Sequence, residues 1–326
     1  MENIVSFHVD VDSPIKLLDF YGLRNSNYTS HDLDDFYRIA LKRALSLFDT
    51  CNIKVTFFVV GEELEKSSIA RGKIQEACLL GHEIANHTYT HCLGLTKLDE
   101  QAIYAEIARC SEVIEKITGA PPQGFRAPGY DMNNKVMEIL EKLHIQYDSS
   151  GNWSMLTPVI QMYHKLFRKE TTIHSGYSET SRRLPLLPYY PSKENWQLAT
   201  EYREIVEVPL PRTKLLKMPF YSNFHLLTPM SYRSTSIKHM KLKFFVYLMH
   251  LNEFIDLTDN VPPSLYRHPN LKTAVAKKIH ILENIILRIT ERYQNIRTDQ
   301  FLKRYRKIGL EQSCPAASNF GGFDNI

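Results

Sequence analysis

Two aspartates near the start of the chain, Asp10 and Asp12, have the type and spacing of groups that share one catalytic centre. They lie in the segment FHVDVD, where apolar and polar residues alternate. Alternate side chains of a β-strand point to one face, so His8, Asp10 and Asp12 share a face, with both carboxylates toward the carboxyl end. Two carboxylates about 6 to 7 Å apart can act in one site. Alone the pattern is weak evidence, because exposed acidic loops also produce it.

Two histidines four residues apart, His87 and His91, indicate a metal site. They stand in the segment GHEIANHTYTH, and this spacing places two imidazoles on one side of a helical turn, where they can converge on one ion. Ordinary polar or core histidines give the same spacing, but here a predicted strand precedes the pair. Two neutral imidazoles, one carboxylate and an open position suit Zn²⁺ or a similar divalent ion in hydrolysis. Asp12 is the natural third ligand.

Strands and helices that alternate along the chain would position these residues. The apolar periodicity predicts strands at residues 4–11, 54–60, 82–86, 124–126, 145–147, 205–209 and 243–249. It predicts helices at residues 32–48, 62–80 with a break near Gly72, 99–117 and 133–143. This alternation with short loops favours a parallel sheet, open or closed into a barrel. In either form, ligands bind at the carboxyl ends of the strands.

Four segments taken in order, FHVDVD, KVTFFVVG, GHEIANHTYTH and GFRAPGY, closely resemble the polysaccharide deacetylase family, also called carbohydrate esterase family 4. The resemblance covers roughly residues 3 to 150 and recurs at VYLMHLNEF. The first motif reads DVD in place of the DD of secreted members, which resembles the cytoplasmic branch. The resemblance implies an α/β fold, an irregular (β/α)7-type barrel in which one aspartate and two histidines bind a metal.

The resemblance also implies roles for single residues. Asp10 looks like the general base, Asp12 like the metal carboxylate, and His87 and His91 like the two imidazole ligands. Arg126, in RAPGY, resembles the arginine that pairs with and orients the base, with a surface salt bridge as its alternative.

The second half of the RAPGY segment departs from the family pattern. The family usually has Tyr directly after the Pro, whereas Gly129 stands here and Tyr130 follows. The backbone N–H of the oxyanion hole therefore belongs to Gly129 or to Tyr130.

A later histidine resembles the group that protonates the leaving amine in the family. His250, at the end of VYLM, takes this place, and His225 in FYSNFHLLTP is its rival. Asp148 in YDSS stands where relatives have an aspartate that supports the acid histidine, although a helix or turn cap explains it almost as well. Trp153 could form a wall of the acyl pocket, with a packed loop anchor as the alternative.

Hydrolysis of an amide is the chemistry that these groups could perform. A divalent ion lowers the pKa of bound water, and a nearby carboxylate removes its proton as it attacks the carbonyl carbon. The ion and a backbone N–H stabilise the oxyanion, and a histidine opposite the base protonates the departing amine. One divalent ion is the expected cofactor, with Zn²⁺ first and Co²⁺, Ni²⁺, Mn²⁺ or Fe²⁺ as alternatives.

The expected reaction removes an N-acyl group, above all N-acetyl, from an amino sugar of a lipid-linked or cytoplasmic glycan precursor. One alternative is an amidohydrolase acting on a small non-sugar amide or cyclic ureide, which a small closed pocket would favour. A second alternative is a non-catalytic sugar-binding protein on the same scaffold. That alternative predicts a broken motif, and none of the expected metal or base positions is broken.

Composition and charge are those of an ordinary globular protein. Hydrophobic residues make up 43% and charged residues 23%, and the net charge of +4 is too small to argue for a nucleic-acid partner. Neither a secretory signal nor a transmembrane apolar run is visible. The odd number of cysteines, without a CxxC pair, favours reduced and mostly buried thiols at Cys51, Cys78, Cys92, Cys110 and Cys314. These features indicate a cytoplasmic protein, and a homo-oligomer stays open.

The predicted organisation is a deacetylase-like barrel at residues 1–260 with a loop-rich insertion at about 149–203. A C-terminal helical extension at residues 261–326 follows, with a flexible tail from about residue 310. Residues 264–307 hold eleven Lys or Arg against three Asp or Glu, with apolar residues at helical spacing at Ile281, Leu282, Ile285 and Ile289. This basic amphipathic helix is expected to pack on the barrel with a solvated basic face, and contact with an anionic membrane is the alternative.

Overall fold

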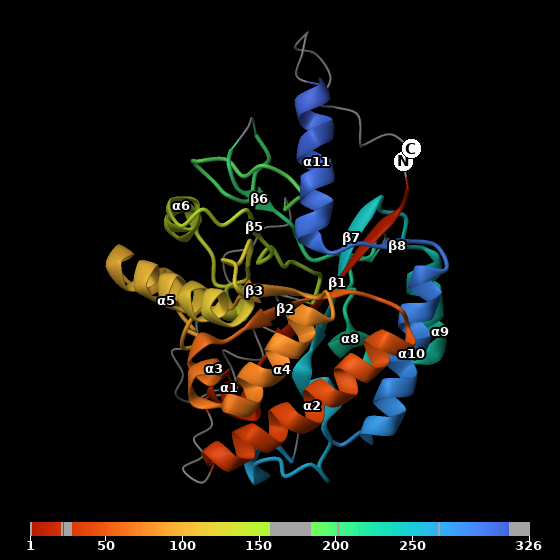
Figure 1. Ribbon diagram of the computed structural model, residues 1–326. Helices are drawn as coiled ribbons and strands as arrows, with labels where there is room; N and C mark the ends of the chain where they lie inside the picture. Colours follow the sequence, from red (N-terminus) through yellow and green to blue (C-terminus); the bar gives the residue numbers. More distant parts are fainter. Residues whose placement is uncertain are drawn as a thin grey trace.

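One parallel β-sheet, with helices packed against its outer face, organises the chain (Figure 1). The computed structural model describes residues 2–20, 22, 28–156, 184–200, 203–214, 216–266 and 268–312. Within these ranges the sheet has eight strands. Seven of them follow the order β6–β5–β4–β3–β2–β1–β7, and β8 pairs with the start of β1. The strands are β1 (Ile4–Val11), β2 (Val55–Val59), β3 (Glu83–Asn86), β4 (Gly124–Phe125), β5 (Tyr147–Asp148), β6 (Val206–Glu207), β7 (Phe244–His250) and β8 (Gln294–Asn295).

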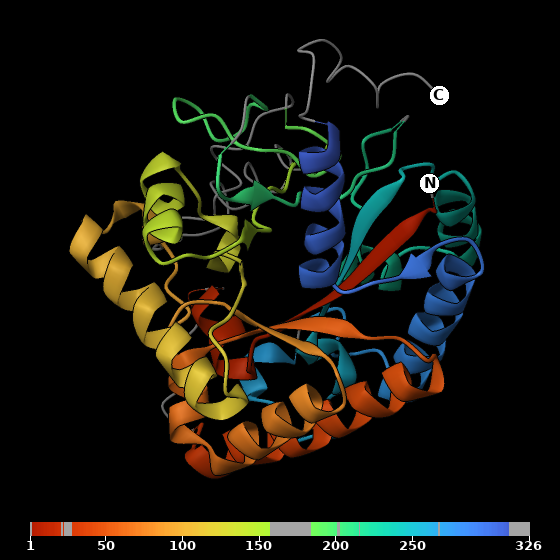
Figure 2. The same cartoon turned by 45° about the horizontal axis from the view of Figure 1, so that its top comes forward.

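Helices follow most strands, and Figure 2 shows α2, α4, α5 and α10 as an outer layer around them. The parallel pairing that the alternation predicts is confirmed for every neighbouring pair of described strands. The α-helices are α1 (Pro14–Phe20), α2 (Ser30–Thr50), α3 (Gly61–Lys66), α4 (Ser68–Leu79), α5 (Glu100–Thr118), α6 (Asn134–Lys142), α8 (Ser222–Leu226), α9 (Met230–Lys238), α10 (Val275–Thr290) and α11 (Thr298–Gln312). Short 3-10 turns are η1 (Leu95–Lys97), η2 (Pro128–Tyr130), η4 (Leu251–Phe254) and η5 (Pro263–Leu265).

The helix after β2 breaks at Ser67, so the predicted break near Gly72 is wrong. Ser67 has an extended backbone, with φ −115° and ψ 115°, and its hydroxyl accepts a hydrogen bond from the Ala70 N–H at 2.9 Å. A serine that caps the following turn in this way ends one helix and begins the next. Gly72 lies inside α4 with open space at the position of a Cβ atom, so nothing there interrupts the helix.

The first strand separates two kinds of side chain, as its alternation predicts. One set is fully buried in the main apolar core with residues of α2 and α10, and comprises Val5, Phe7, Val9 and Val11. The buried polar residues of β1 alternate with this apolar set. Among them, His8 has its ring 5.0 Å from the ring of Phe58, which belongs to another apolar cluster. The strand thus places Asp10 among buried groups, at the carboxyl end of the sheet.

The C-terminal segment packs against the sheet. In α10, Leu282, Ile285 and Ile289 are buried in the main core together with residues of β1 and α2. Lys278 departs from the predicted solvated basic face, because it is buried and donates a hydrogen bond to the Ile255 carbonyl. Farther on, the Phe301 ring of α11 stacks on Phe244 of β7 with ring centroids 3.9 Å apart.

The described part of the predicted insertion is loop-rich, with isolated bridges that join Tyr189 to Glu207 and Pro191 to Ala199. The rest of the insertion (157–183 and 201–202) lies outside the described residues, as do Cys314 and most of the predicted tail, residues 313–326. The four described cysteines form no disulfide, as predicted. Across the described ranges, no helix has the length and apolar character that crossing a bilayer requires.

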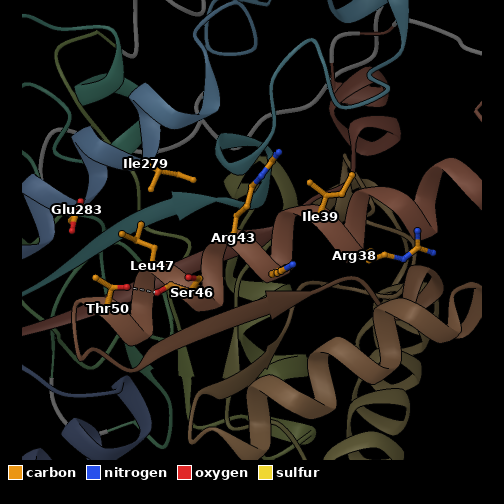
Figure 3. Close-up of a pocket in the computed structure, with 9 residues that line it drawn as sticks. Arg38, Ile39, Arg43, Ser46, Leu47, Thr50, Ile279 and Glu283 are labelled. Carbon is orange, nitrogen blue, oxygen red and sulfur yellow. Dashed lines mark hydrogen bonds between the residues drawn. The ribbon is translucent and has the colours of Figure 1, made fainter.

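A groove of about 580 Å³ lies on the helical outside of the fold, between α2 and α10 (Figure 3). Its lining mixes basic, apolar and polar side chains, namely Arg38, Ile39, Lys42, Arg43, Ser46, Leu47, Thr50, Ile279 and Glu283. None of the residues predicted to carry chemistry lines this groove. The groove is therefore separate from the carboxyl ends of the strands, where those residues lie.

Candidate active site

Asp12, His87 and His91 converge just beyond the carboxyl ends of β1 and β3, as the sequence predicts. The Oδ1 atom of Asp12 lies 3.4 Å from the Nε2 atom of each histidine. One ligand atom from each of the three residues lies within 4.8 Å of the other two. Both histidines are buried, and the Asp12 side chain is 17% exposed. This cluster has the composition of an Asp-His-His metal site with access from one side.

The loop that carries the two histidines is not the predicted helical turn. Thr88 and His91 have positive φ values, 63° and 61°, and a left-handed conformation costs a β-branched residue about 1–3 kcal/mol. Two side-chain contacts hold the loop: Asn86 Oδ1 accepts from the Thr88 N–H at 2.8 Å, and the Thr88 hydroxyl accepts from the Cys92 N–H at 3.0 Å. The histidines converge because this loop folds back on itself. Their convergence does not depend on a helical turn with a spacing of four residues.

The three residues fit a divalent cation. His87 Nδ1 lies 2.6 Å from the Arg126 carbonyl oxygen, which can only accept, so Nδ1 carries the proton and the Nε2 lone pair faces Asp12. Asp12 Oδ1 is buried without a hydrogen-bond partner among the described residues. Although burial raises the pKa of the Asp12 carboxyl, His91 and His87 hold it well below its usual range. A buried carboxylate oxygen between two imidazole nitrogens is a position that a cation satisfies.

Asp10 is buried beside this cluster, and Arg126 fixes its carboxylate. The Nη1 atom of Arg126 donates to Asp10 Oδ1 at 2.5 Å. Arg126 is fully buried, which rules out the surface salt bridge considered as its alternative. Its Nε and Nη2 atoms donate to the carbonyl and hydroxyl oxygens of Ser149, each at 2.8 Å, and its guanidinium stacks 4.2 Å from the Phe58 ring centroid. These contacts fix the plane of the guanidinium and thereby the orientation of Asp10.

His250, at the end of β7, faces Asp10. Its Nε2 atom lies 3.8 Å from Asp10 Oδ2, and its Nδ1 atom lies 3.7 Å from Glu253 Oε1. Burial lowers the pKa of His250, but the carboxylates of Glu253, Asp10 and Asp12 raise it more, to about 9. The imidazole is therefore protonated at neutral pH, which suits a proton donor.

His225, the rival of His250, belongs to the core. Its Nδ1 atom lies 3.0 Å from the Tyr247 hydroxyl, and its Nε2 atom lies 3.2 Å from the Ser236 hydroxyl. Burial lowers its pKa to about 3. A neutral histidine whose two ring nitrogens both contact hydroxyl groups is a packing residue, so the geometry favours His250 as the proton donor.

Comparison with known proteins agrees with this geometry. Residues 28–147 match the family model described as polysaccharide deacetylase. Over this segment the chain is similar to polysaccharide deacetylases. It is 29% identical over 165 residues to a peptidoglycan deacetylase of Helicobacter pylori, which covers 48% of this chain and 52% of that protein. It is 34% identical over 115 residues to a peptidoglycan deacetylase-like protein of Gibberella zeae, covering 35% of this chain and 33% of that protein.

The chain thus spans about half, or less, of the length of these curated relatives. Among solved structures, a Mycobacterium smegmatis protein assigned as a polysaccharide deacetylase superposes with a TM-score of 0.58 at 17% identity. The match covers 94% of this chain and 91% of that chain. At this identity the likeness concerns the fold alone, and it confirms the predicted irregular (β/α)7-type deacetylase barrel.

Asp148 does not support His250, so that prediction is corrected. Asp148 Oδ1 accepts from the Ser150 hydroxyl at 2.6 Å, and its carboxyl lies beside that of Glu207, which accepts from the Gly151 N–H at 2.8 Å. Burial raises the pKa of both carboxyls, and the neighbouring Asp148 raises that of Glu207 further. Four strands separate β5 from β7 in the sheet order. Glu253, to which the sequence gives no role, takes the place beside His250.

Gly129 and Tyr130 both have positive φ values, 61° and 60°. The Tyr130 N–H donates to the Ala127 carbonyl at 2.9 Å and so already has a partner within the chain. This hydrogen bond favours the Gly129 N–H as the donor to an oxyanion.

Trp153 is buried in an apolar cluster that includes Ala127, and the Arg212 guanidinium lies 5.2 Å from its ring centroid. This burial agrees with the packed loop anchor that was the alternative for Trp153. Its role as a wall of the acyl pocket stays a prediction.

Proposed function

We propose that this chain hydrolyses an N-acyl group, above all N-acetyl, from an amino sugar of a glycan. The observation that carries the proposal is the arrangement around Asp10, which lies between Arg126 and His250 and beside the Asp12, His87 and His91 cluster. The peptidoglycan deacetylase of Helicobacter pylori among its relatives supports the same reaction class. The cytoplasmic location, the DVD-type branch, a homo-oligomer and contact with an anionic membrane stay predictions from the sequence.

Asp12, His87 and His91 would hold one divalent ion. Two imidazole nitrogens and one carboxylate oxygen suit Zn²⁺ first, with Co²⁺, Ni²⁺, Mn²⁺ or Fe²⁺ as alternatives. When bound, such an ion supplies a Lewis acid that polarises the acyl carbonyl and makes water a stronger nucleophile at neutral pH.

The remaining groups account for the proton transfers. Asp10, held by Arg126, accepts a proton from the attacking water. The Gly129 N–H donates to the acyl oxygen as negative charge develops there. The imidazolium of His250, kept charged by Glu253, gives its proton to the leaving nitrogen, because an amide anion is a very poor leaving group. Base and acid lie close enough to contact one amide group.

Glu253→Gln is expected to move the alkaline limb of kcat to lower pH. The reaction needs the protonated form of His250, and a neighbouring carboxylate raises a histidine pKa by about one unit or more. Because Gln can still accept from the Ser222 hydroxyl, which lies 2.6 Å from Glu253 Oε1, the fold should be retained. The pH profile of acetate release measures the shift, with the exposed Glu291→Gln on the outside of the fold as control. An unmoved alkaline limb would contradict the role of Glu253.

Release of acetate by the metal-loaded protein tests the proposed function. The substrates are N-acetylated amino sugars in three forms, oligomeric, nucleotide-linked and lipid-linked, and small cyclic amides form a fourth group. Acetate from any sugar form supports the proposal, and the form preferred identifies the substrate class. Hydrolysis of cyclic amides alone would instead establish the amidohydrolase alternative. Binding of sugar without turnover of any substrate would establish the non-catalytic one.

A further inference from the structure

A buried line of hydrogen bonds joins the start of α11 to the proposed base. The Thr298 hydroxyl lies 2.7 Å from His8 Nε2, and His8 Nδ1 lies 2.7 Å from Arg126 Nη2. Arg126 in turn holds Asp10. All four side chains are buried, and Thr298 and His8 are 290 residues apart in the chain. Neither residue lies in the segment that matches the family model, residues 28–147.

The chemistry of Arg126 fixes the direction of both hydrogen bonds that His8 makes. The guanidinium of Arg126 can only donate, so His8 Nδ1 must accept and the ring proton must sit on Nε2. His8 Nε2–H therefore donates to the Thr298 hydroxyl oxygen, which also lies 2.8 Å from Ser6 Oγ. Burial and the Arg126 charge hold the pKa of His8 well below its usual value, so the ring stays neutral.

These hydrogen bonds hold the Arg126 side chain in place, so we call Thr298 and His8 together the brace of Arg126. The Nη2 atom of Arg126 has two partners, the Ser149 hydroxyl and His8 Nδ1. Without His8, one N–H of a fully buried guanidinium would lose its acceptor, which is costly for a charged group. The guanidinium could then tilt on the Phe58 ring and turn the carboxylate of Asp10 away from its working orientation.

We propose that His8 and Thr298 are positioning residues of the deacetylase site, and this inference rests on the proposed function. They act through Arg126 and contact neither the substrate nor the metal cluster. Through them the packing of α11 on the barrel determines how well the base is aligned. Their effect should appear in kcat and leave KM unchanged, because Arg126 orients a group that works in the chemical step.

Thr298→Val and Thr298→Ser are the matched pair that tests the inference. Val keeps the shape of Thr but removes the acceptor for His8 Nε2–H, and a fall in kcat of roughly 10-fold at constant KM is expected. Ser keeps the hydroxyl and should restore most of the rate. Equal kcat in the two variants would overturn the inference, as would a loss confined to KM.

The ring tautomer of His8 gives a readout independent of activity. In the protein labelled with ¹⁵N-histidine, the His8 resonances should show a bare Nδ1 and a protonated Nε2 across neutral pH. In Thr298→Val the Nε2–H signal should shift or exchange faster, because its acceptor is gone. A proton on Nδ1 would overturn the line of hydrogen bonds. If the His8 tautomer is as expected but no sugar substrate releases acetate, the hydrogen bonds of the brace are confirmed and the proposed function is wrong.

Discussion

Asp10→Asn is expected to lower kcat for acetate release by about 10²- to 10⁴-fold, the range that a positioned general base contributes. The substitution keeps the shape of the side chain, and the amide oxygen can still accept from Arg126 Nη1. The amide cannot accept a proton from water. Asp10 is not part of the Asp12, His87 and His91 cluster, so metal binding should stay close to that of the unaltered protein.

Acetate release and metal titration on the same preparation separate the two effects. Asp49→Asn, at an exposed position near the end of α2, is the matched control and should leave both quantities unchanged. If Asp10→Asn retains the full rate, another group is the base. If it loses the metal, Asp10 belongs among the ligands.

His87→Ala is expected to weaken metal binding by more than about 100-fold and to abolish acetate release. Loss of an outer-shell partner already costs a site 10- to 100-fold in affinity, and His87 supplies a ligand atom. A chelator applied to the unaltered protein should abolish the activity as well, and added Zn²⁺ should restore it. Isothermal titration and the acetate assay measure the two losses.

His87 is buried and bonded to the Arg126 carbonyl, so its removal could also disturb the fold. His91→Ala is therefore the second variant, because His91 Nδ1 has no hydrogen-bond partner among the described residues. His280→Ala, on the exposed face of α10, is the control. Metal affinity that survives both cluster substitutions would show that the ion binds elsewhere.

The local pattern of apolar and capping residues predicts many of the strands and helices of this structure. Alternation along residues 4–11 predicts both the strand and the shared face of His8 and Asp10, because strand geometry repeats every two residues. The helix at residues 99–117 is also predictable, since Asp99 caps its start and Gly119 takes a left-handed conformation at its end.

Two features of the site could not be predicted from apolar periodicity, namely the backbone of the histidine loop and the partner of His250. The loop of His87 and His91 has positive φ values that Asn86 stabilises, whereas the spacing alone predicts a helical turn. The partner of His250 could not be chosen either. Glu253 lies beside His250 and Asp148 does not, because β5 and β7 are far apart in the sheet order. Local periodicity does not predict strand order.

β1 comes first among the described strands along the chain, but it pairs with the last two. β1 pairs with β7 and β8, whose residues leave the ribosome only after more than 240 others. At about 5 to 20 residues per second, some 15 to 60 s pass before β8 can pair with the start of β1. Throughout that time the apolar edge of β1 lacks its partners, and Arg126 lacks the brace that reaches it from α11. We therefore expect the pairing of β1 and the alignment of Asp10 to be completed late, once β7, β8 and the start of α11 have been synthesised.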